Sequence, residues 1–346
     1  MIEIGSEFAY ADNQIYLNED GLDWLPYGED NIFTFSGRTA IETVLRDCGD
    51  FNKVLLTSYC CDSMIEPFRN KGANLNFYDV NYDRSFNIDI KIPDDCQILL
   101  LCNYFGFEYN FNEEEIIKFK EKGGIIIEDV THSLLSVKQY HEFSDYLVAS
   151  LRKWGPLLDG GFCSKKKGQF LEKPDNLVSS LYIEQKTRAM KLKSLYLQNG
   201  REELKQEYLE IFSWCNHYLA KNYSNTLISD DSKKMLKKWN IEEIRKKRIS
   251  NAAVLYFGLR DVSYIEPVFD ESDMDCPIFV PVLVKAGKRD LVRQKLIDNS
   301  IYCPVHWPVP NDKCASDLYD MELSLICDQR YDDSDMHQII KVLRGI

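Results

Sequence analysis

Five short apolar runs between residues 54 and 150 constrain the fold more than any other feature of this sequence. They are VLLT (54–57), LNFYDV (75–80), QILLLCNYFG (97–106), GIIIEDV (124–130) and DYLVAS (145–150). Each run is continuously apolar rather than alternating, which is typical of strands covered on both faces in a parallel sheet. Helix-like stretches accompany them at 39–47, 63–71 and 112–122. Strands and helices at this spacing predict an α/β fold with a mostly parallel central sheet and helices on both faces.

The pattern changes after about residue 167. Residues 177–219 and 233–258 predict long helices, interrupted near Gly200 and around 223–231. The basic run KKMLKKW, followed by EEIRKKR, is best explained as the solvated face of an amphipathic helix rather than as a binding patch. From Pro277 a strand-like run, a helix, the segment IYCPVHWPVP and a last helix over 334–343 predict a small α+β unit.

Composition excludes several classes of protein. The 346 residues carry a net charge of -13, which argues against a broad nucleic-acid-binding surface, and no apolar run reaches the roughly 20 residues that span a membrane. The first residues have neither a basic region nor a long apolar stretch, so we expect no signal peptide. Eleven scattered cysteines, an odd number, fit reduced thiols and a cytoplasmic location, and the absence of CxxC and HExxH predicts no metal site.

A turn of small residues precedes the first helix. The strand-like NIFTF is followed by Ser36, Gly37, Arg38 and Thr39, and then by helical sequence. A helix N-terminus offers backbone N–H groups and the positive end of its dipole to an anion, to which Arg38 and Thr39 can add donors. The alternative is that Ser36 is an ordinary helix cap.

An acid ends the fourth apolar run. Asp129 ends the run IIIED and so belongs at the carboxyl end of a buried strand, where open α/β sheets bind ligands. It is either a structural acid that caps the next helix or the partner of a protonated cofactor ring. His132, three residues later, is placed to reach the same ligand.

A lysine follows the fifth run. Lys153 comes three residues after Ser150 and shortly before Gly160 and Gly161. Partial burial at the end of a strand disfavours the ammonium form of a lysine and makes the amine a usable nucleophile. The alternative is a lysine whose head group reaches water.

The order of these features is more specific than any one of them. An anion-binding turn, an aromatic residue after the next strand (Tyr59), an acid and a lysine would hold a flat, phosphorylated, protonatable ring that carries an aldehyde. Pyridoxal 5'-phosphate (PLP) is such a molecule.

The sequence resembles the DegT/StrS family of PLP-dependent sugar aminotransferases, which have the type I fold of aspartate aminotransferase. The resemblance rests on IGSEF, SGRTAIETVL, TSYCCDSMIEPF, NYFGF, IIIEDVTHS, ASLRKW with DGG, IYCPVHWP and CDQRY. It implies that Lys153 binds the coenzyme aldehyde, that Asp129 pairs with the ring nitrogen and that His132 lies by the ring hydroxyl. It further implies a set of cofactor contacts at Gly37, Arg38, Thr39, Ser150 and, stacking on the ring, Tyr59.

The resemblance also implies an activity and an organisation. The expected reaction transfers an amino group, from glutamate, to a nucleotide-linked keto sugar in polysaccharide or deoxysugar biosynthesis, in a homodimer with shared active sites. The expected divisions are an N-terminal segment (1–30) packed on the small domain, a large PLP-binding domain (31–245, with 170–245 mainly helical) and a small C-terminal domain (246–346). Candidate substrate contacts are His306, Trp307, Arg330 and Tyr331, for which a packing role is the alternative.

Departures from the family pattern leave other functions open. Trp154 and LLDGG replace the usual residues after the lysine, and residues 103–106 replace a His-Leu-Tyr-Gly stretch. Another PLP reaction such as elimination, or a non-catalytic protein that keeps the fold, therefore remains an alternative.

Overall fold

The computed structural model describes residues 3–10, 21–83, 85–109, 111–285, 287–310 and 316–346. Internal contacts divide the chain into two compact units, which are described separately. Unit 1 comprises residues 7–49 and 146–241, and unit 2 comprises residues 3–6, 50–145 and 242–346. The domain boundaries expected from the sequence stay a prediction, and residues 11–20 of the expected N-terminal segment lie outside the described residues.

The described residues of unit 1 form three antiparallel strands and four α-helices. Its strands are β2 (Asp30–Thr34), β9 (Gly161–Lys165) and β8 (Tyr146–Ser150), paired in that order. Its helices are α1 (Gly37–Asp47), α4 (Ser180–Asn199), α5 (Glu202–Lys221) and α6 (Asp230–Leu236). A short 3₁₀ helix, η2 (Leu151–Lys153), follows β8. The strand β9 begins at the second of two glycines, which indicate a loop, so the sequence alone did not predict it.

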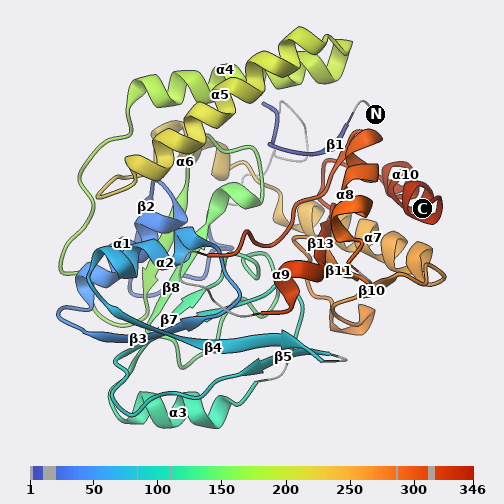
Figure 1. Ribbon diagram of the computed structural model, residues 1–346. Helices are drawn as coiled ribbons and strands as arrows, with labels where there is room; N and C mark the ends of the chain where they lie inside the picture. Colours follow the sequence, from blue (N-terminus) through green and yellow to red (C-terminus); the bar gives the residue numbers. More distant parts are fainter. Residues whose placement is uncertain (1–2, 11–20, 84, 110, 286, 311–315) are drawn as a thin grey trace. The chain divides into compact units, whose positions relative to one another are not determined.

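The helices α4 and α5 form an antiparallel pair, side by side in Figure 1. Gly200 ends α4 in the left-handed conformation, with a φ of 69°, which glycine adopts without steric cost. The pair packs through buried residues that include Met190, Tyr208 and Phe212. The predicted interruption of the helical region near Gly200 is therefore confirmed.

Unit 2 contains the parallel strands expected from the apolar runs. The order is β7 (Ile125–Asp129), β6 (Ile98–Cys102), β3 (Lys53–Thr57), β4 (Asn74–Tyr82) and β5 (Phe86–Asp89). The first four pair in parallel, and β5 turns back on β4 as an antiparallel hairpin. Helices α2 (Asp62–Asn70) and α3 (Glu113–Glu121) fall at the predicted places.

The C-terminal part of unit 2 is a smaller α+β arrangement. Its strands are β10 (Ile265–Pro267), β11 (Val280–Val284) and β13 (Glu322–Leu325), all antiparallel, and a separate pair formed by β1 (Ile4–Gly5) and β12 (Ile301–Tyr302). Its helices are α7 (Ile241–Leu259), α8 (Arg289–Asp298), α9 (Leu318–Met321) and α10 (Asp333–Arg344), and a 3₁₀ helix, η3, spans Glu271–Asp273.

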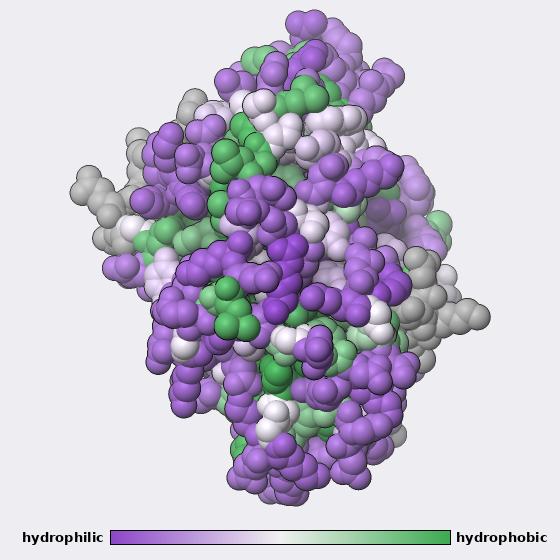
Figure 2. All heavy atoms as spheres, turned by 90° about the vertical axis from the view of Figure 1, so that its left-hand side faces the viewer, coloured by the Kyte–Doolittle hydropathy of each residue, from purple (hydrophilic) through white to green (hydrophobic). Residues whose placement is uncertain are grey.

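The polar surface agrees with the composition. Figure 2 shows one side of the molecule, which is mainly hydrophilic with a few small hydrophobic patches. In the basic run, Lys234, Lys237, Lys238 and Lys246 are exposed, whereas Lys233 and Lys247 are half-buried. Arg248 is the exception, because it is buried and donates to Gln329 and to the carbonyl oxygens of Pro277 and Ile278. Among the described helices, none is long and apolar enough to cross a membrane.

Candidate active site

In unit 1, two glycines let the N-terminus of α1 pack against the end of β8. A Cβ atom on Gly37 would lie 3.1 Å from the Cβ of Ser150, and one on Gly161 would lie 2.2 Å from the carbonyl carbon of Ser36. The close approach therefore depends on the absence of side chains at both positions. Lys153 ends the 3₁₀ helix that follows Ser150 directly. The turn that offers backbone N–H groups and the candidate lysine thus belong to one local structure.

The side chains of this turn are already used within the protein. The Ser36 hydroxyl accepts a hydrogen bond from the Thr39 N–H at 3.2 Å, so the interpretation of Ser36 as a helix cap is confirmed. Arg38 donates to the Ala220 carbonyl at 3.0 Å, and the Thr39 hydroxyl donates to the Tyr223 carbonyl at 2.8 Å. What α1 offers to an anion is consequently its backbone and its dipole. Cofactor contacts by the Arg38 and Thr39 side chains stay predictions that these bonds do not support.

The departures from the family pattern after Lys153 have structural roles. Trp154 has no exposed surface and belongs to the core. Asp159 is equally buried, and its carboxylate accepts hydrogen bonds from the N–H and the hydroxyl of Ser229, at 2.8 and 2.6 Å. Burial raises the pKa of the Asp159 carboxyl. Trp154 therefore packs in the core, and Asp159 connects the loop after β8 to the start of α6. Both roles are structural rather than catalytic.

In unit 2, Asp129 and His132 lie where β7 ends. Asp129 is the last residue of the strand and is 8% exposed, and its Oδ1 accepts from the Thr131 N–H at 2.8 Å. The Nδ1 of His132 accepts from the Phe105 N–H at 3.2 Å. An imidazole that accepts at Nδ1 carries its proton on Nε2 when neutral, so this tautomer leaves Nε2–H as the donor. The contact with Thr131 fits a structural acid, and the position at the end of a strand fits the partner of a cofactor ring.

Four of the predicted residues meet in one group of rings in unit 2. We call it the aromatic cluster, and its members are Tyr59, Tyr104, Phe105, His132, His306 and Trp307. Trp307 stacks on His132 with ring centroids 5.7 Å apart and planes 16° apart. His306 meets His132 edge-on at 5.7 Å. The structure therefore brings two candidate substrate residues to a candidate cofactor residue that is far away in the sequence.

Tyr59 is more deeply buried than its expected role requires. Its ring has no exposed surface, stacks on Tyr104 at 5.8 Å and meets Trp307 and Tyr319 edge-on. Its hydroxyl donates to the His306 carbonyl. Burial is the main reason that the pKa of Tyr59 is raised. Stacking of Tyr59 on a coenzyme ring stays a prediction, and it would require this packing to rearrange.

A buried acid, missed by the sequence analysis, holds His306. Glu322 has no exposed surface and accepts from the His306 N–H at 2.7 Å. The Ser324 hydroxyl lies 2.5 Å from Glu322 Oε1 and 2.7 Å from His306 Nδ1. Burial raises the pKa of Glu322 to about 8, against the opposing effects of Ser324, the His306 N–H and Arg289. The Glu322 carboxyl group therefore fixes the backbone of His306, and Ser324 fixes its ring. No sequence pattern indicates these contacts.

A second buried acid organises the loop after β7. Glu128 precedes Asp129 and has no exposed surface. Its carboxylate accepts from Asn103 Nδ2 at 2.9 Å, from the His141 N–H at 2.9 Å and from the Ser144 hydroxyl at 2.5 Å. The Nδ1 of His141 also lies 2.9 Å from Oε1, so this buried carboxyl group has the hydrogen-bond partners that burial requires. An acid inside the apolar run IIIED was the only sequence signal for this network.

Arg330 and Tyr331 make contacts of another kind. Arg330 forms a two-point ion pair with Asp328, at 2.8 and 2.7 Å, and also donates to the Ser6 carbonyl. The Tyr331 hydroxyl accepts from the Gly5 N–H at 2.7 Å. These bonds tie the N-terminal strand β1 to the loop before α10. The substrate role predicted for both residues stays a prediction, and their printed contacts fit the packing alternative.

Comparison with known proteins gives the fold. No protein-family model matches the sequence, and no curated protein matches it. PseC of Helicobacter pylori, an aminotransferase involved in pseudoaminic acid biosynthesis, matches with a TM-score of 0.68 at 15% identity, over 99% of this chain and 98% of that chain. DesI, solved in the presence of its TDP-sugar product, matches with a TM-score of 0.66 at 13% identity, over 98% and 86%. The PLP form of Spr1654 of Streptococcus pneumoniae, described as a putative sugar aminotransferase, matches with a TM-score of 0.63 at 12% identity, over 98% and 92%.

These matches span nearly the whole chain. The chain therefore has the type I PLP-transferase fold of these solved structures, and the α/β prediction is confirmed. A fold hosts many activities, so the activity itself is argued from the residues.

Proposed function

We propose that this protein is a PLP-dependent aminotransferase that transfers an amino group to a nucleotide-linked keto sugar, with glutamate as the donor. The observation that carries the proposal is the local structure of unit 1, where the N-terminus of α1 packs against Ser150 and Lys153 follows three residues later. An anion site and an amine at this spacing suit a coenzyme that carries both a phosphate and an aldehyde. The solved structures with this fold support the same conclusion, because those reported above are described as aminotransferases or were solved with a sugar product.

The residues present fit this coenzyme. A Cβ on Gly37 would crowd Ser150, so the glycine keeps the start of α1 open to a phosphate. In unit 2, Asp129 offers a carboxylate at the end of a strand, and the His132 tautomer offers an Nε2–H donor. We propose that Gly37 and Ser150 hold the phosphate, that Asp129 pairs with the ring nitrogen and that His132 donates to the ring hydroxyl.

The proposed chemistry assigns a proton to each reacting side chain. Bound PLP supplies an electron sink that stabilises negative charge on the carbon that loses a proton. The carboxylate of Asp129 keeps the proton on the ring nitrogen, which maintains that capacity. The Nζ of Lys153 would serve as the general base, holding the proton between its removal from the amino donor and its return. The buried rings of the aromatic cluster keep water from the face of His132.

The proposal extends to the substrate and the assembly. PseC and DesI are the basis for proposing a nucleotide-linked sugar, since the first serves pseudoaminic acid biosynthesis and the second was solved with a TDP-sugar. We propose contacts with that substrate from His306 and Trp307. The homodimer and the cytoplasmic location implied by the family resemblance stay predictions, which light scattering and fractionation would test.

Substitution of Lys153 tests the proposal. Lys153→Ala is expected to lose the visible absorbance of lysine-bound PLP and the conversion of PLP to its amine form by glutamate. Lys167→Ala, an exposed lysine in the loop after β9, is the matched control and should keep both. Retained conversion in Lys153→Ala would refute the catalytic role of this lysine.

Substitution of the acid separates the two interpretations of Asp129. Asp129→Ala should keep part of its PLP binding and lose most of its turnover, since the ring nitrogen then loses its counter-charge. Undiminished turnover would show that Asp129 only caps the turn to Thr131. A panel of nucleotide-linked keto sugars with glutamate as donor would then identify the acceptor, and a non-catalytic protein would convert none of them.

A further inference from the structure

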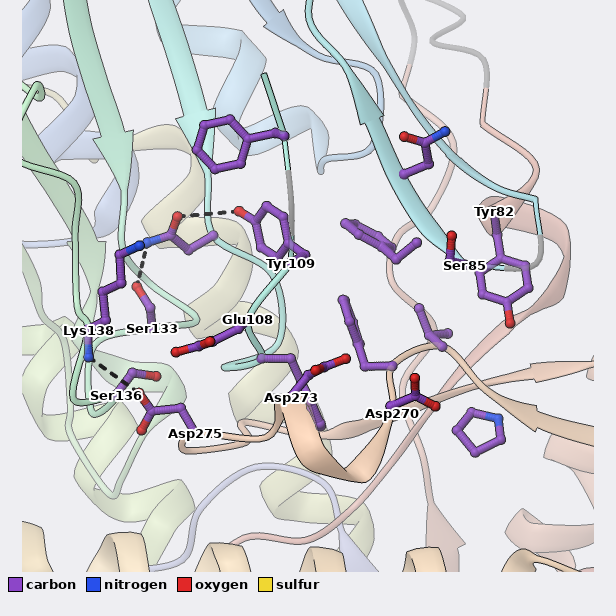
Figure 3. Close-up of a pocket in the computed structure, with 18 of the residues that line it drawn as sticks. Tyr82, Ser85, Glu108, Tyr109, Ser133, Ser136, Lys138, Asp270, Asp273 and Asp275 are labelled. Carbon is purple, nitrogen blue, oxygen red and sulfur yellow. Dashed lines mark hydrogen bonds between the residues drawn. The ribbon is translucent and has the colours of Figure 1, made fainter. Parts of the chain in front are cut away.

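The described residues of unit 2 surround a large cavity. Its volume is about 630 Å³, and four stretches of chain line it: the β4–β5 hairpin, the segment after β6, the loop after β7 and the residues that follow β10 (Figure 3). Asp129, His132, His306 and Trp307 do not line it. We call it the acidic cavity, for the reason given next.

Carboxylates dominate the charge of the acidic cavity. Among the described residues, the acids on its wall are Glu108, Glu113, Asp270, Asp273 and Asp275, against a single lysine, Lys138. Asp275 is ion-paired with Arg245 at 3.3 Å. Among the described residues, no lysine or arginine forms an ion pair with Glu108, Asp270 or Asp273. A concave surface with this balance attracts cations and repels the diphosphate of a nucleotide sugar.

A buried hydroxyl on the wall points to a ligand independently of the charge. Ser136 is 6% exposed, and its Oγ has no hydrogen-bond partner in the described structure. Figure 3 shows its side chain among the residues that line the cavity, near Glu108 and Asp275. A buried hydroxyl without a partner costs free energy, which a hydrogen bond from a bound molecule would recover.

The size and the lining of the cavity suit an organic ligand rather than a metal ion. Among the described residues, no three His, Cys, Asp or Glu side chains are close enough to hold a metal. The cavity is also far larger than an ion needs. Its walls include the rings of Phe86, Phe107 and Phe269, the last two stacked 4.9 Å apart. Aromatic rings beside carboxylates suit an organic cation, which gains from both the charges and the rings.

We propose that the acidic cavity binds a cationic amino sugar that carries no nucleotide. Its ammonium group would pair with a carboxylate of the group Glu108, Asp270 and Asp273. The amide of Asn87 and the hydroxyls of Ser85 and Ser136 would bond its hydroxyl groups, and the phenylalanine rings would pack on its apolar face. The site is independent of the reaction proposed above, since none of the residues proposed to act on PLP takes part.

Calorimetric titration of the full-length protein tests the proposal, with D-glucosamine as the probe and neutral N-acetylglucosamine as its matched control. We expect saturable binding of glucosamine and at least about tenfold weaker binding of the acetylated sugar, the factor that corresponds to one lost ion pair or cation–π contact. The double variant Asp270→Asn with Asp273→Asn should weaken glucosamine binding by about tenfold or more. Glu114→Gln, an 85% exposed acid on α3 outside the cavity, should leave binding unchanged.

Four results would overturn the proposal. They are the absence of saturable glucosamine binding, equal binding of the two sugars, full binding by the double variant, and displacement of glucosamine by a nucleotide-linked sugar. The last would assign the cavity to the substrate of the proposed reaction instead. Lys153→Ala should bind glucosamine like the unaltered protein, so failure of the aminotransferase proposal and failure of this one are distinguishable.

Discussion

The aromatic cluster and the acidic cavity lie on either side of one short segment of unit 2 and differ in how the protein uses their polar atoms. Tyr104 and Phe105 place their rings in the cluster, whereas Phe107 and Glu108 line the cavity. In the cluster, the Tyr59 hydroxyl and the Nδ1 atoms of both histidines bond to the protein. In the cavity, the carboxylates of Glu108, Asp270 and Asp273 form no ion pair with a described lysine or arginine. The buried hydroxyl of Ser136 has no hydrogen-bond partner among the described residues.

The difference separates a region built for positioning from one built for binding. Groups whose hydrogen bonds are completed inside the protein are held in one geometry, which is what a catalytic ring stack requires. Groups left incomplete keep their interactions for a ligand, at some cost to stability. Substitutions should therefore be costly to folding in the cluster and nearly neutral in the cavity.

The largest expected loss of stability is at Trp307. Trp307→Ala removes a ring that is 8% exposed and packed against Tyr59, Phe105 and His132, so the free energy of unfolding should fall by up to about 5 kcal/mol. Urea unfolding measures it, with Trp214→Ala, a residue 39% exposed on α5, as the control. A loss no greater than that of the control would show that the cluster is not a packed core.

The next effect is a pH dependence from Glu322. Its pKa is raised from 4.5 to about 8 by burial, so between these values the folded protein binds a proton that the unfolded chain has released. Stability must then fall as pH rises through this range, by about 4 kcal/mol between pH 5 and pH 9. Glu322→Gln cannot ionise and should lose this part of the dependence. Parallel stability curves for the two proteins over this range would contradict the assignment.

A smaller effect is expected at Ser324. Ser324→Ala removes the hydroxyl between Glu322 and His306, which leaves two buried groups short of a partner and should cost about 2 kcal/mol. Ser85→Ala, an exposed serine of the cavity wall, is the matched control and should change stability by less than about 0.5 kcal/mol. Equal effects of the two substitutions would remove the contrast between the regions.

The smallest effect is expected in the cavity itself. Asp270 is exposed and has no described cationic partner, so Asp270→Asn should change the free energy of unfolding by less than about 0.5 kcal/mol. Chemical denaturation would detect a larger loss. Such a loss would mean that the carboxylate stabilises the fold, and the cavity could not then be described as keeping its charges for a ligand.

Local sequence patterns were enough to predict much of the fold. The apolar runs became β3, β4, β6, β7 and β8, and the three early helices appeared within two residues of their expected ends. The strand β9 was missed because Gly160 and Gly161 resemble a loop, although Gly161 is needed where Ser36 packs against it. The hairpin partner β5 was missed too, because pairing depends on residues brought together only by folding.

The site was predictable only in part, for the same physical reason. Positions that follow strands, such as Asp129 and Lys153, could be recognised because a strand end is a local signal. Three contacts join distant parts of the chain. Trp307 stacks on His132, the His306 N–H donates a hydrogen bond to Glu322, and Arg38 donates one to the Ala220 carbonyl. No spacing within the sequence encodes such contacts.

The most direct test of the central claim is to trap the coenzyme on the lysine. Borohydride reduction of the protein loaded with PLP, followed by proteolysis and mass spectrometry, locates the modified residue. The account predicts a single major adduct on the peptide that contains Lys153, and its loss when glutamate is added before the reduction. An adduct on another lysine, or none on the Lys153 peptide, would contradict the account.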